Sequence, residues 1–253
     1  MNYISGVRLL HKYVGVTCEA MDSHDVKLMQ RGIALTHDRE LPLRRPITID
    51  ILGQLAALCD ALHPIGVIYK CVFVLAFFGM LRISNLLPVS AGAFNIRENL
   101  CNADVWEHTP GLVIMLRWSK TRQTRRQPHL VGLPRLRNRP DICPVLAYRQ
   151  YCKVAPLTAR GPMFVLPNGT VVTQAMARAA LKLLLKHLGL SASLLQFHGF
   201  RKGGAQLCYS LGINVEHIKA HGDWASDCVW DYIAPGRYAP SPHVPAALAQ
   251  RLT

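Results

Sequence analysis

Apolar residues recur every three to four positions over most of the chain, and this spacing predicts a mainly helical protein. The longest apolar stretch, Cys71–Leu81, is well short of the roughly 20 residues that a membrane-spanning helix needs, so we expect a buried core helix there. Thr48 can cap the helix that follows it, because its hydroxyl accepts from free backbone amides. The predicted helices cover Ile49–Leu62, Ile65–Leu81, Pro144–Tyr151, Thr173–Leu188, Gly199–Leu211 and Val215–Ala220.

One region departs from the helical pattern. Leu112–Trp118 is apolar and rich in β-prone residues, and His129–Leu133 resumes this character after a polar, arginine-rich turn. Two such runs joined by a turn predict a β-hairpin. The expected fold class is therefore mainly α with a small antiparallel β-sheet.

The chain divides into segments of different composition. Residues 1–32 carry apolar residues at helical spacing with a break at Gly15–Ser23, which predicts two short helices. Residues 33–46 are polar and charged with two prolines, and we expect a linker there. Residues 47–234 are long enough to bury a large core, and 235–253 form a proline-containing C-terminal tail.

The charge of the chain is strongly positive and unevenly distributed. The formal net charge is +14 and the pI is about 9.7. Between Glu107 and Glu216 the one acidic residue is Asp141, whereas Lys and Arg number sixteen. A basic run is usually a solvated face, but an imbalance over so long a segment favours a polyanionic partner, and we expect nucleic acid.

Cysteine and histidine spacing gives no sign of a metal site. The eight cysteines contain no Cys-x-x-Cys pair and no secretory signal precedes them, so we expect reduced thiols in an intracellular protein. His217 and His221 are four residues apart, but Ile218 stands where a His-Glu-x-x-His zinc site has its Glu. We therefore expect neither a metal nor another cofactor.

Four short segments carry residue types that suit chemistry on a phosphodiester. Arg offers a planar fork for phosphate oxygens, His moves a proton near neutral pH, an indole N–H donates a hydrogen bond, and Tyr can attack phosphorus. The segments are FGMLRISNL at 78–86, FHGFRKGG at 197–204, HGDWASD at 221–227 and DYI at 231–233.

These segments resemble the active-site motifs of the tyrosine recombinases, the phage-integrase family. The Gly-Asp-Trp sequence at 222–224, with Trp224 and Tyr232 eight residues apart, is most similar to recombinases of eukaryotic mobile elements of the DIRS, Ngaro and Crypton kind. The resemblance covers roughly residues 45–235. It implies a catalytic domain at 47–234, preceded by the remnant of a helical DNA-binding domain at 1–32 that a longer protein would complete.

The resemblance also implies a role for each motif residue. Tyr232 is the expected nucleophile, and Arg82 and Arg201 are expected to bind the non-bridging phosphate oxygens. Tyr209 follows Arg201 too closely to match the family spacing, and Tyr238 lacks a flanking helical pattern. A half-buried structural aromatic and a structural ion pair are the ordinary alternatives for Tyr232 and Arg82.

Three further residues are implied to move protons or contact the phosphate. His198 lies three residues before Arg201, so at a helix start both side chains share one face. Trp224 is expected to donate its indole N–H to the phosphate, although packing between helices is its common alternative. Lys120, at the hairpin turn, is expected to protonate the leaving 5′-oxygen. Asn85 stands where many bacterial relatives carry Glu, so Arg82 needs another acidic partner or has none.

We expect site-specific DNA recombination or integration through a covalent 3′-phosphotyrosyl intermediate, by a homotetramer on double-stranded DNA, with no membrane association. A catalytically inactive DNA-binding protein and a type IB topoisomerase-like enzyme are the alternatives. If the source is eukaryotic, the protein acts in the nucleus. The residues expected to contact DNA are Arg117, Arg122, Arg125, Arg126, Lys202 and His221.

Overall fold

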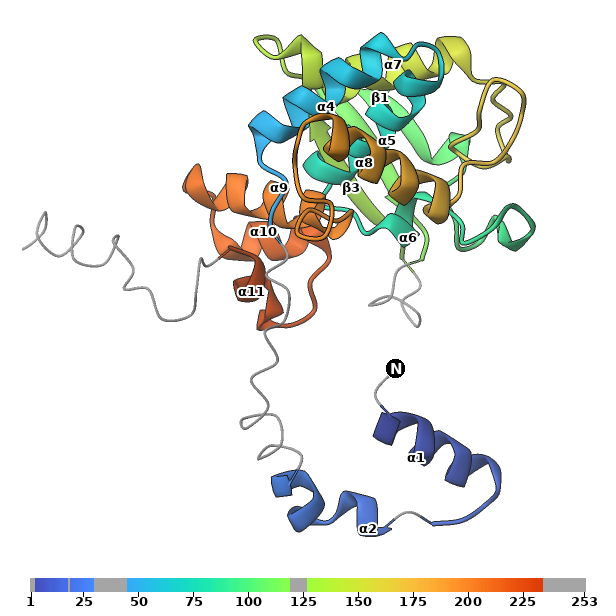
Figure 1. The fold of residues 1–253 in the computed structure, drawn as a ribbon, viewed down its shortest axis with the longest axis vertical. Helices are drawn as coiled ribbons and strands as arrows, with labels where there is room; N and C mark the ends of the chain where they lie inside the picture. Colours follow the sequence, from blue (N-terminus) through green and yellow to red (C-terminus); the bar gives the residue numbers. More distant parts are fainter. Residues whose placement is uncertain (1–2, 18, 30–44, 119–126, 234–253) are drawn as a thin grey trace, which may run out of the picture. The chain divides into compact units, whose positions relative to one another are not determined.

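A computed structural model of the chain describes residues 3–17, 19–29, 45–118 and 127–233, coloured along the sequence in Figure 1. The chain forms two compact units, 1–43 and 44–253. The first unit contains α1 (Tyr3–Tyr13), α2 (Glu19–Asp22) and a helical segment over 24–29. Most of the predicted linker at 33–46 and the whole predicted tail at 235–253 lie outside the described residues.

The second unit is mainly helical with one small sheet, as the hydrophobic pattern predicts. Most of the predicted helices differ from the observed ones by no more than two residues at either end. The helices are α4 (Ile49–Ala61), α5 (Ile65–Phe78), α6 (Ile83–Leu86), α7 (Pro144–Val154), α8 (Gln174–His187), α9 (His198–Ser210), α10 (Val215–Gly222) and α11 (Trp230–Ile233).

The sheet has three antiparallel strands in the order β1-β2-β3. Strands β2 (Gly111–Leu116) and β3 (His129–Pro134) form the predicted hairpin, with Ile114 paired to Val131. The pattern missed β1 (Val105–His108), because that strand has only four residues and buries only the first of them. Alternate residues of β3 are buried against the helices, which gives the sheet one inner and one outer face.

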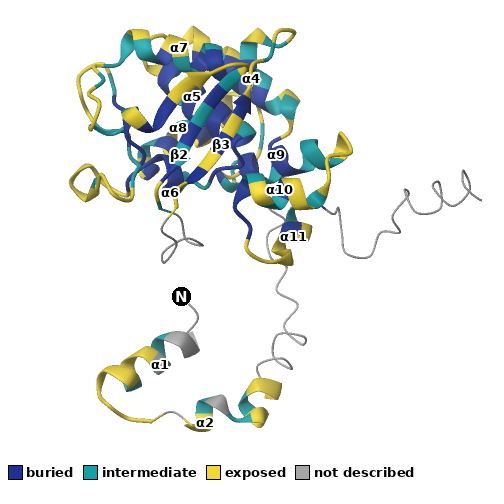
Figure 2. Cartoon of the chain, turned by 180° about the vertical axis from the view of Figure 1, so that it is seen from behind, coloured by how far each residue is buried: buried dark blue, intermediate teal, exposed yellow. Residues whose placement is uncertain are grey.

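Helix α5 is the centre of the core. Its residues from Gly66 to Phe77 are buried on nearly every side, except for half-buried Tyr69, and it packs against α4, α7 and α9. Figure 2 shows the buried residues gathered where the helices and the sheet meet, while α1 and α2 are largely exposed. Lys70 is a charged residue within this core, and its Nζ lies 2.7 Å from Asp60 Oδ2. None of the helices that the structure describes is long and apolar enough to span a bilayer.

Two glycines bring α9 close to α5 and to the segment before α4. A Cβ on Gly203 would lie 1.8 Å from the Ile47 carbonyl oxygen, and one on Gly204 would lie 2.1 Å from the Phe77 carbonyl oxygen. A side chain does not fit at either position. The Gly-Gly pair therefore lets the first turns of α9 lie against the C-terminal end of α5.

Helix α5 ends three residues earlier than the pattern predicts. Gly79 caps it, and Met80 then takes a left-handed backbone conformation with φ 49°. The apolar pattern continues through Leu81 because both Met80 and Leu81 are buried, although neither is helical. This turn directs the chain into the extended residue Arg82.

Candidate active site

Arg201 is almost fully buried, with 1 % of its surface exposed. It lies in the first turn of α9, and its Nη1 donates to the carbonyl oxygens of Met80 at 2.6 Å and Gly222 at 2.7 Å. Its Nε and Nη2 are buried and make no hydrogen bond within the described chain. Half of the guanidinium fork is thus held by main-chain carbonyls, and the other half is available to an acceptor that is not part of this chain.

Both carbonyls that hold Arg201 belong to left-handed turns. Met80 itself has φ 49°, and Asp223, which follows Gly222, has φ 57°. Such a conformation costs a non-glycine residue about 1–3 kcal/mol and persists where the surroundings enforce it. The two bonds from Arg201 stabilise both turns and connect the end of α5 to the end of α10.

The hydroxyl of Tyr232 meets the imidazole of His198. Its oxygen lies 2.9 Å from His198 Nε2, and the two ring centroids are 5.2 Å apart. His198 is the first residue of α9, one turn before Arg201, and Tyr232 comes from α11. An imidazole at this distance can accept the phenolic proton as the oxygen becomes a nucleophile.

Trp224 lies between Arg201 and Tyr232. The Arg201 Cζ is 3.7 Å from the centroid of the indole ring, and the Tyr232 ring meets the indole edge to face at 5.1 Å. The Trp224 side chain packs in a small apolar cluster, yet its Nε1 is buried with no hydrogen-bond partner among the described residues. Trp224 Nε1 is therefore a third donor at this site without an acceptor, after Arg201 Nε and Nη2. Leaving a buried N–H without a partner costs about 1–3 kcal/mol.

Two arginines, Arg82 and Arg201, and one buried carboxylate, Asp223, set the charge of the site. Burial, and then the charge of Arg82, lower the pKa of Arg201 to about 9, while Tyr232 and Asp223 partly oppose the shift. Arg82 is half-buried and has no ion pair within the described chain. Asn85 contributes no charge; its Oδ1 accepts from the Arg82 backbone N–H at 2.9 Å and caps α6. An anion bound between the two guanidinium groups would relieve their repulsion.

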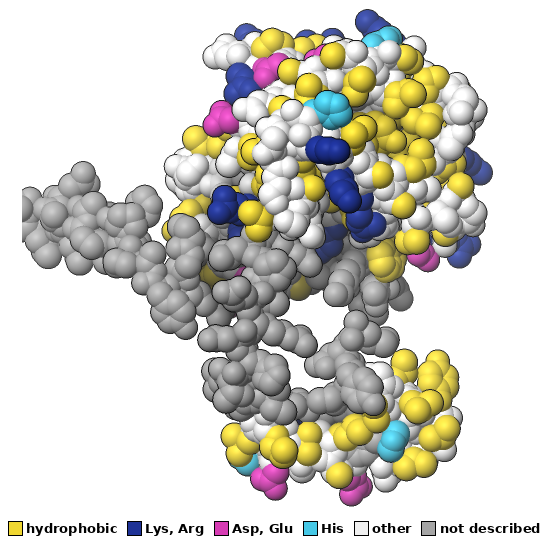
Figure 3. Space-filling view, viewed as in Figure 1, with side chains coloured by type: hydrophobic (Ala, Val, Ile, Leu, Met, Phe, Trp, Pro, Cys, Tyr) yellow, Lys and Arg dark blue, Asp and Glu magenta, His cyan; other side chains and the backbone are white. Residues whose placement is uncertain are grey.

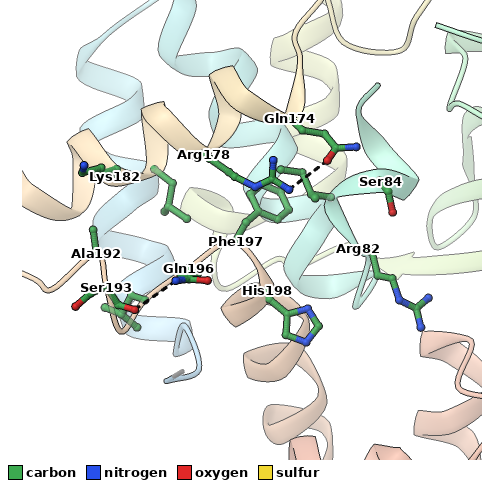
Figure 4. A pocket seen from close by; sticks show the side chains of 13 residues that line it. Arg82, Ser84, Gln174, Arg178, Lys182, Ala192, Ser193, Gln196, Phe197 and His198 are labelled. Atoms are coloured by element: carbon green, nitrogen blue, oxygen red, sulfur yellow. Dashed lines mark hydrogen bonds between the residues drawn. The ribbon is translucent and has the colours of Figure 1, made fainter. Parts of the chain in front are cut away.

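A groove of about 710 Å³ extends from this site along α8. Figure 4 shows Arg82 and His198 at one end of it and Arg178 and Lys182 on α8, with Gln174 accepting from Arg178 at 3.2 Å. Figure 3 shows Lys and Arg side chains gathered on the same face. The lining contains no Asp or Glu; it consists of Arg82, Ile83, Ser84, Gln174, Arg178, Leu181, Lys182, Ala192, Ser193, Leu195, Gln196, Phe197 and His198.

No protein-family model matches the chain, and no curated protein is similar to it in sequence. Solved structures are similar to it in fold. An integrase of the Tn1549 transposon in complex with transposon right end DNA aligns with a TM-score of 0.59 at 13% identity, over 87% of this chain and 70% of that one. A lambda integrase dimer bound to a core site aligns with a TM-score of 0.53 at 16% identity, over 82% and 53% of the two chains.

The XerH site-specific recombinase, bound to its difH substrate in a pre-cleavage complex, aligns with a TM-score of 0.52 at 14% identity. The match covers 73% of this chain, which spans about half the length of XerH, 48%. The fold is that of the tyrosine recombinases. At this level of identity the comparison establishes the recombinase fold alone.

Within the recombinase fold, the structure brings most of the predicted catalytic residues together. His198 contacts Tyr232, Tyr232 contacts Trp224, Trp224 contacts Arg201, and the charge of Arg82 acts on Arg201. Lys120, together with the predicted DNA contacts Arg122, Arg125 and Arg126, lies outside the described residues. No group of three or more His, Cys, Asp or Glu side chains suited to a metal occurs in the described part of the chain.

The other predicted DNA contacts have different surroundings. Arg117 forms an ion pair with the buried carboxylate of Asp104, so it supplies a structural counter-charge. His221 is half-buried, and its Nε2 bonds the Phe78 carbonyl oxygen at 2.9 Å. Lys202 is half-buried on α9, next to Arg201. The prediction omitted the groove residues Arg178 and Lys182, although their i, i+4 spacing on a predicted helix is visible in the sequence.

Proposed function

We propose that this protein cleaves and rejoins DNA strands through a covalent 3′-phosphotyrosyl intermediate formed by Tyr232. One observation carries the proposal. The Tyr232 hydroxyl lies 2.9 Å from the His198 imidazole, beside three buried donors, Arg201 Nε, Arg201 Nη2 and Trp224 Nε1, that have no partner in the described chain. A nucleophile with an adjacent base and unpaired donors for an anion is the set that attack on a phosphodiester requires.

In the first step, the Tyr232 oxygen attacks the scissile phosphorus while His198 Nε2 takes its proton. A bond forms between phosphorus and the tyrosine oxygen, and the bond from phosphorus to the 5′-oxygen breaks. The leaving 5′-oxygen takes a proton, for which Lys120 is the proposed donor. In the second step, a 5′-hydroxyl of the partner strand attacks the phosphotyrosine and gives its proton back to Lys120. The bond from phosphorus to the tyrosine oxygen breaks, and Tyr232 regains its proton from His198. Both steps exchange one phosphate ester for another and need no metal.

The transition state places extra negative charge on the non-bridging oxygens. Arg201, through Nε and Nη2, and Trp224, through Nε1, are proposed to donate to these oxygens, and Arg82 to neutralise part of their charge. The bonds to Met80 and Gly222 hold Arg201 in place before DNA binds, so little reorganisation accompanies the reaction. Removing one such preorganised donor typically slows catalysis by about 100- to 1,000-fold.

Double-stranded DNA is the proposed substrate, with its backbone along the basic groove beside α8. Arg178 and Lys182 on α8, with Arg82 at the end of the groove, provide positive charge without a neighbouring carboxylate in the lining. The solved proteins of the same fold include complexes with transposon and recombination-site DNA. Backbone contacts of this kind position a duplex, whereas contacts to base edges would choose its sequence.

The wider context is also proposed. We propose recombination or integration between two DNA sites by a tetramer, in the nucleus, for a eukaryotic mobile element. This rests on the Gly-Asp-Trp segment and the spacing of eight residues from Trp224 to Tyr232. Residues 1–32 are proposed to be the remnant of a helical DNA-binding domain, supported by helices α1 and α2.

A covalent trapping experiment tests the proposed chemistry. Wild type and Tyr232→Phe are incubated with a pool of nicked duplexes of randomised sequence, and protein–DNA adducts are resolved on a denaturing gel. We expect an adduct from wild type only, because the substitution removes the nucleophilic oxygen and leaves the ring in edge-to-face contact with Trp224. Sequencing the trapped DNA would also give the preferred site.

Other outcomes of this experiment support other functions. An adduct from both proteins would place the nucleophile elsewhere, with Tyr209 and Tyr238 the next to substitute. Binding without an adduct would favour an inactive DNA-binding protein. Relaxation of a supercoiled plasmid without exchange between two duplexes would favour a topoisomerase-like enzyme.

A further inference from the structure

Two histidines join three segments that are far apart in the sequence. The Nε2 of His221, at the end of α10, lies 2.9 Å from the Phe78 carbonyl oxygen at the end of α5. The Nε2 of His129, the first residue of β3, lies 3.0 Å from the carbonyl oxygen of His221. A carbonyl oxygen only accepts, so each ring must carry its proton on Nε2 and donate it. The catalytic roles proposed above use neither histidine.

We propose that His221 and His129 are positioning residues that fix the orientation of the Arg201 guanidinium. The inference rests on the proposed function, because its consequence is a correctly aimed phosphate ligand. It differs from the sequence-based prediction for His221, which treats this side chain as a DNA contact.

The hydrogen bonds of Arg201 and of His221 both connect the end of α5 with the end of α10. Arg201 Nη1 holds the carbonyls of Met80 and Gly222, and His221 joins the carbonyl of Phe78, two residues before Met80, to the residue next to Gly222. The histidines therefore fix the distance between the two carbonyls that Arg201 bridges. His129 extends this connection to β3 by holding the His221 carbonyl.

Because the guanidinium is planar, fixing one of its nitrogens fixes the directions of the other two. Nη1 has two hydrogens, and the carbonyls of Met80 and Gly222 accept both. The positions of these two oxygens set the plane of the group and thus the directions in which Nε and Nη2 point. A shift of about 1 Å in the end of α10 would turn those donors away from the phosphate, and a misplacement of that size costs on the order of 100-fold in rate.

A direct phosphate contact suits His221 less well. Its Nε2 is occupied by the Phe78 carbonyl, and burial lowers the pKa of the ring, with a further lowering from His129. At neutral pH the ring is therefore uncharged and offers a phosphate no cation. The charged and titratable groups near His221 are His129, packed against α10 from β3, Arg201, which bonds the adjacent Gly222, and the buried Asp223, which follows Gly222.

The test compares substitutions that keep or remove the donor. Gln can donate to a carbonyl as the imidazole does, and Phe cannot. His221→Gln and His129→Gln are compared with His221→Phe and His129→Phe, and His217→Phe, on an exposed position one turn earlier in α10, is the matched control. The adduct formation rate at saturating DNA, the affinity for duplex and the melting temperature are measured for each.

We expect both Phe variants to form adduct about 10- to 100-fold more slowly with duplex affinity within twofold of wild type. The Gln variants should be within about threefold of wild type in both quantities, and His217→Phe should match wild type. Equal rates in wild type and the Phe variants, or a loss of affinity parallel to the loss of rate, would overturn the proposal. Failure of the Gln variants in folded protein would also overturn it.

A second readout does not depend on DNA cleavage. The Arg201 Nε–H resonance, assigned by its absence in Arg201→Lys, is followed by nitrogen-15 NMR in the free protein. Wild type and the Gln variants should show a slowly exchanging signal that is shifted or lost in the Phe variants. An unchanged signal in both Phe variants would refute the positioning role, whether or not wild type forms an adduct. Absence of an adduct from wild type would by itself refute only the proposed function.

Discussion

At the scale of single residues, the site is defined by donors that the protein leaves unused. Arg201 and Trp224 lie in contact, both almost fully buried, with three N–H groups that meet no acceptor in the described chain. Folding proteins generally satisfy such groups, so their accumulation at one point is a sign of a ligand. A phosphate would provide acceptors for these three N–H groups and a negative charge to counter the positive charges of Arg82 and Arg201.

Substituting Trp224 separates its donor role from its packing role. Trp224→Phe keeps an aromatic ring over Arg201 but removes Nε1, and we expect adduct formation to slow by about 100- to 1,000-fold. Trp224→His, which can restore an N–H, should recover part of the rate. Single-turnover trapping measures both variants, and a Trp224→Phe rate equal to wild type would assign Trp224 to packing only.

His221 makes a prediction about stability and pH. Burial holds its pKa below the ordinary value of 6.5, so the unfolded chain binds the proton more tightly than the folded protein does. The free energy of unfolding should therefore be fully maintained above about pH 6.5 and fall as the pH drops through the lowered folded-state pKa. In urea unfolding between pH 5 and 7.5, His221→Gln should show a shallower pH dependence than wild type, and an identical slope would contradict the assignment.

At the scale of elements, the close approach of α9 to α5 brings Arg201 to the Met80 carbonyl. This approach depends on Gly203 and Gly204, whose missing side chains leave room for main-chain carbonyls. The helices themselves are predictable from local spacing and caps, as the Thr173 hydroxyl shows by accepting from the Met176 N–H at the start of α8. The contact between them joins residues 121 positions apart, and no local pattern announces it.

Gly203→Ala tests this contact. The new methyl group would meet the Ile47 carbonyl at 1.8 Å, so we expect a loss of at least about 1–3 kcal/mol of stability and of most adduct formation. Gly132→Ala on β3 is the control, since a Cβ there meets nothing within 4 Å. Chemical denaturation measures both variants. A Gly203→Ala protein as stable as Gly132→Ala would show that α9 does not need this close packing.

At the scale of the molecule, positive charge and the basic groove predict binding that weakens steeply with salt. Each phosphate contact releases about one counterion, so Arg178→Ala and Lys182→Ala should each reduce the slope of log affinity against log salt by about one. Lys153→Ala, exposed on α7 and outside the groove lining, should leave the slope unchanged. Fluorescence anisotropy on a duplex at several salt concentrations measures these slopes. Equal effects of all three variants would show that the DNA does not bind along the groove.

The sequence by itself determined what depends on neighbours in the chain. Helical spacing predicted the helices around α5, and two apolar, β-prone runs joined by a polar turn predicted the hairpin β2-β3. The resemblance of short motifs to those of the tyrosine recombinases pointed to Arg82, His198, Arg201, Trp224 and Tyr232. These features are local because backbone periodicity, caps and short motifs involve residues within a few positions of one another.

The tertiary structure decided which partner each polar group meets. It paired Arg117 with Asp104 and His221 with Phe78, and it placed Arg178 and Lys182 along one groove with Arg82. Whether a basic side chain is a structural counter-charge, a positioning group or a free cation depends on burial and on acceptors from distant segments. Folding alone brings those acceptors together, so only the three-dimensional arrangement distinguishes these roles.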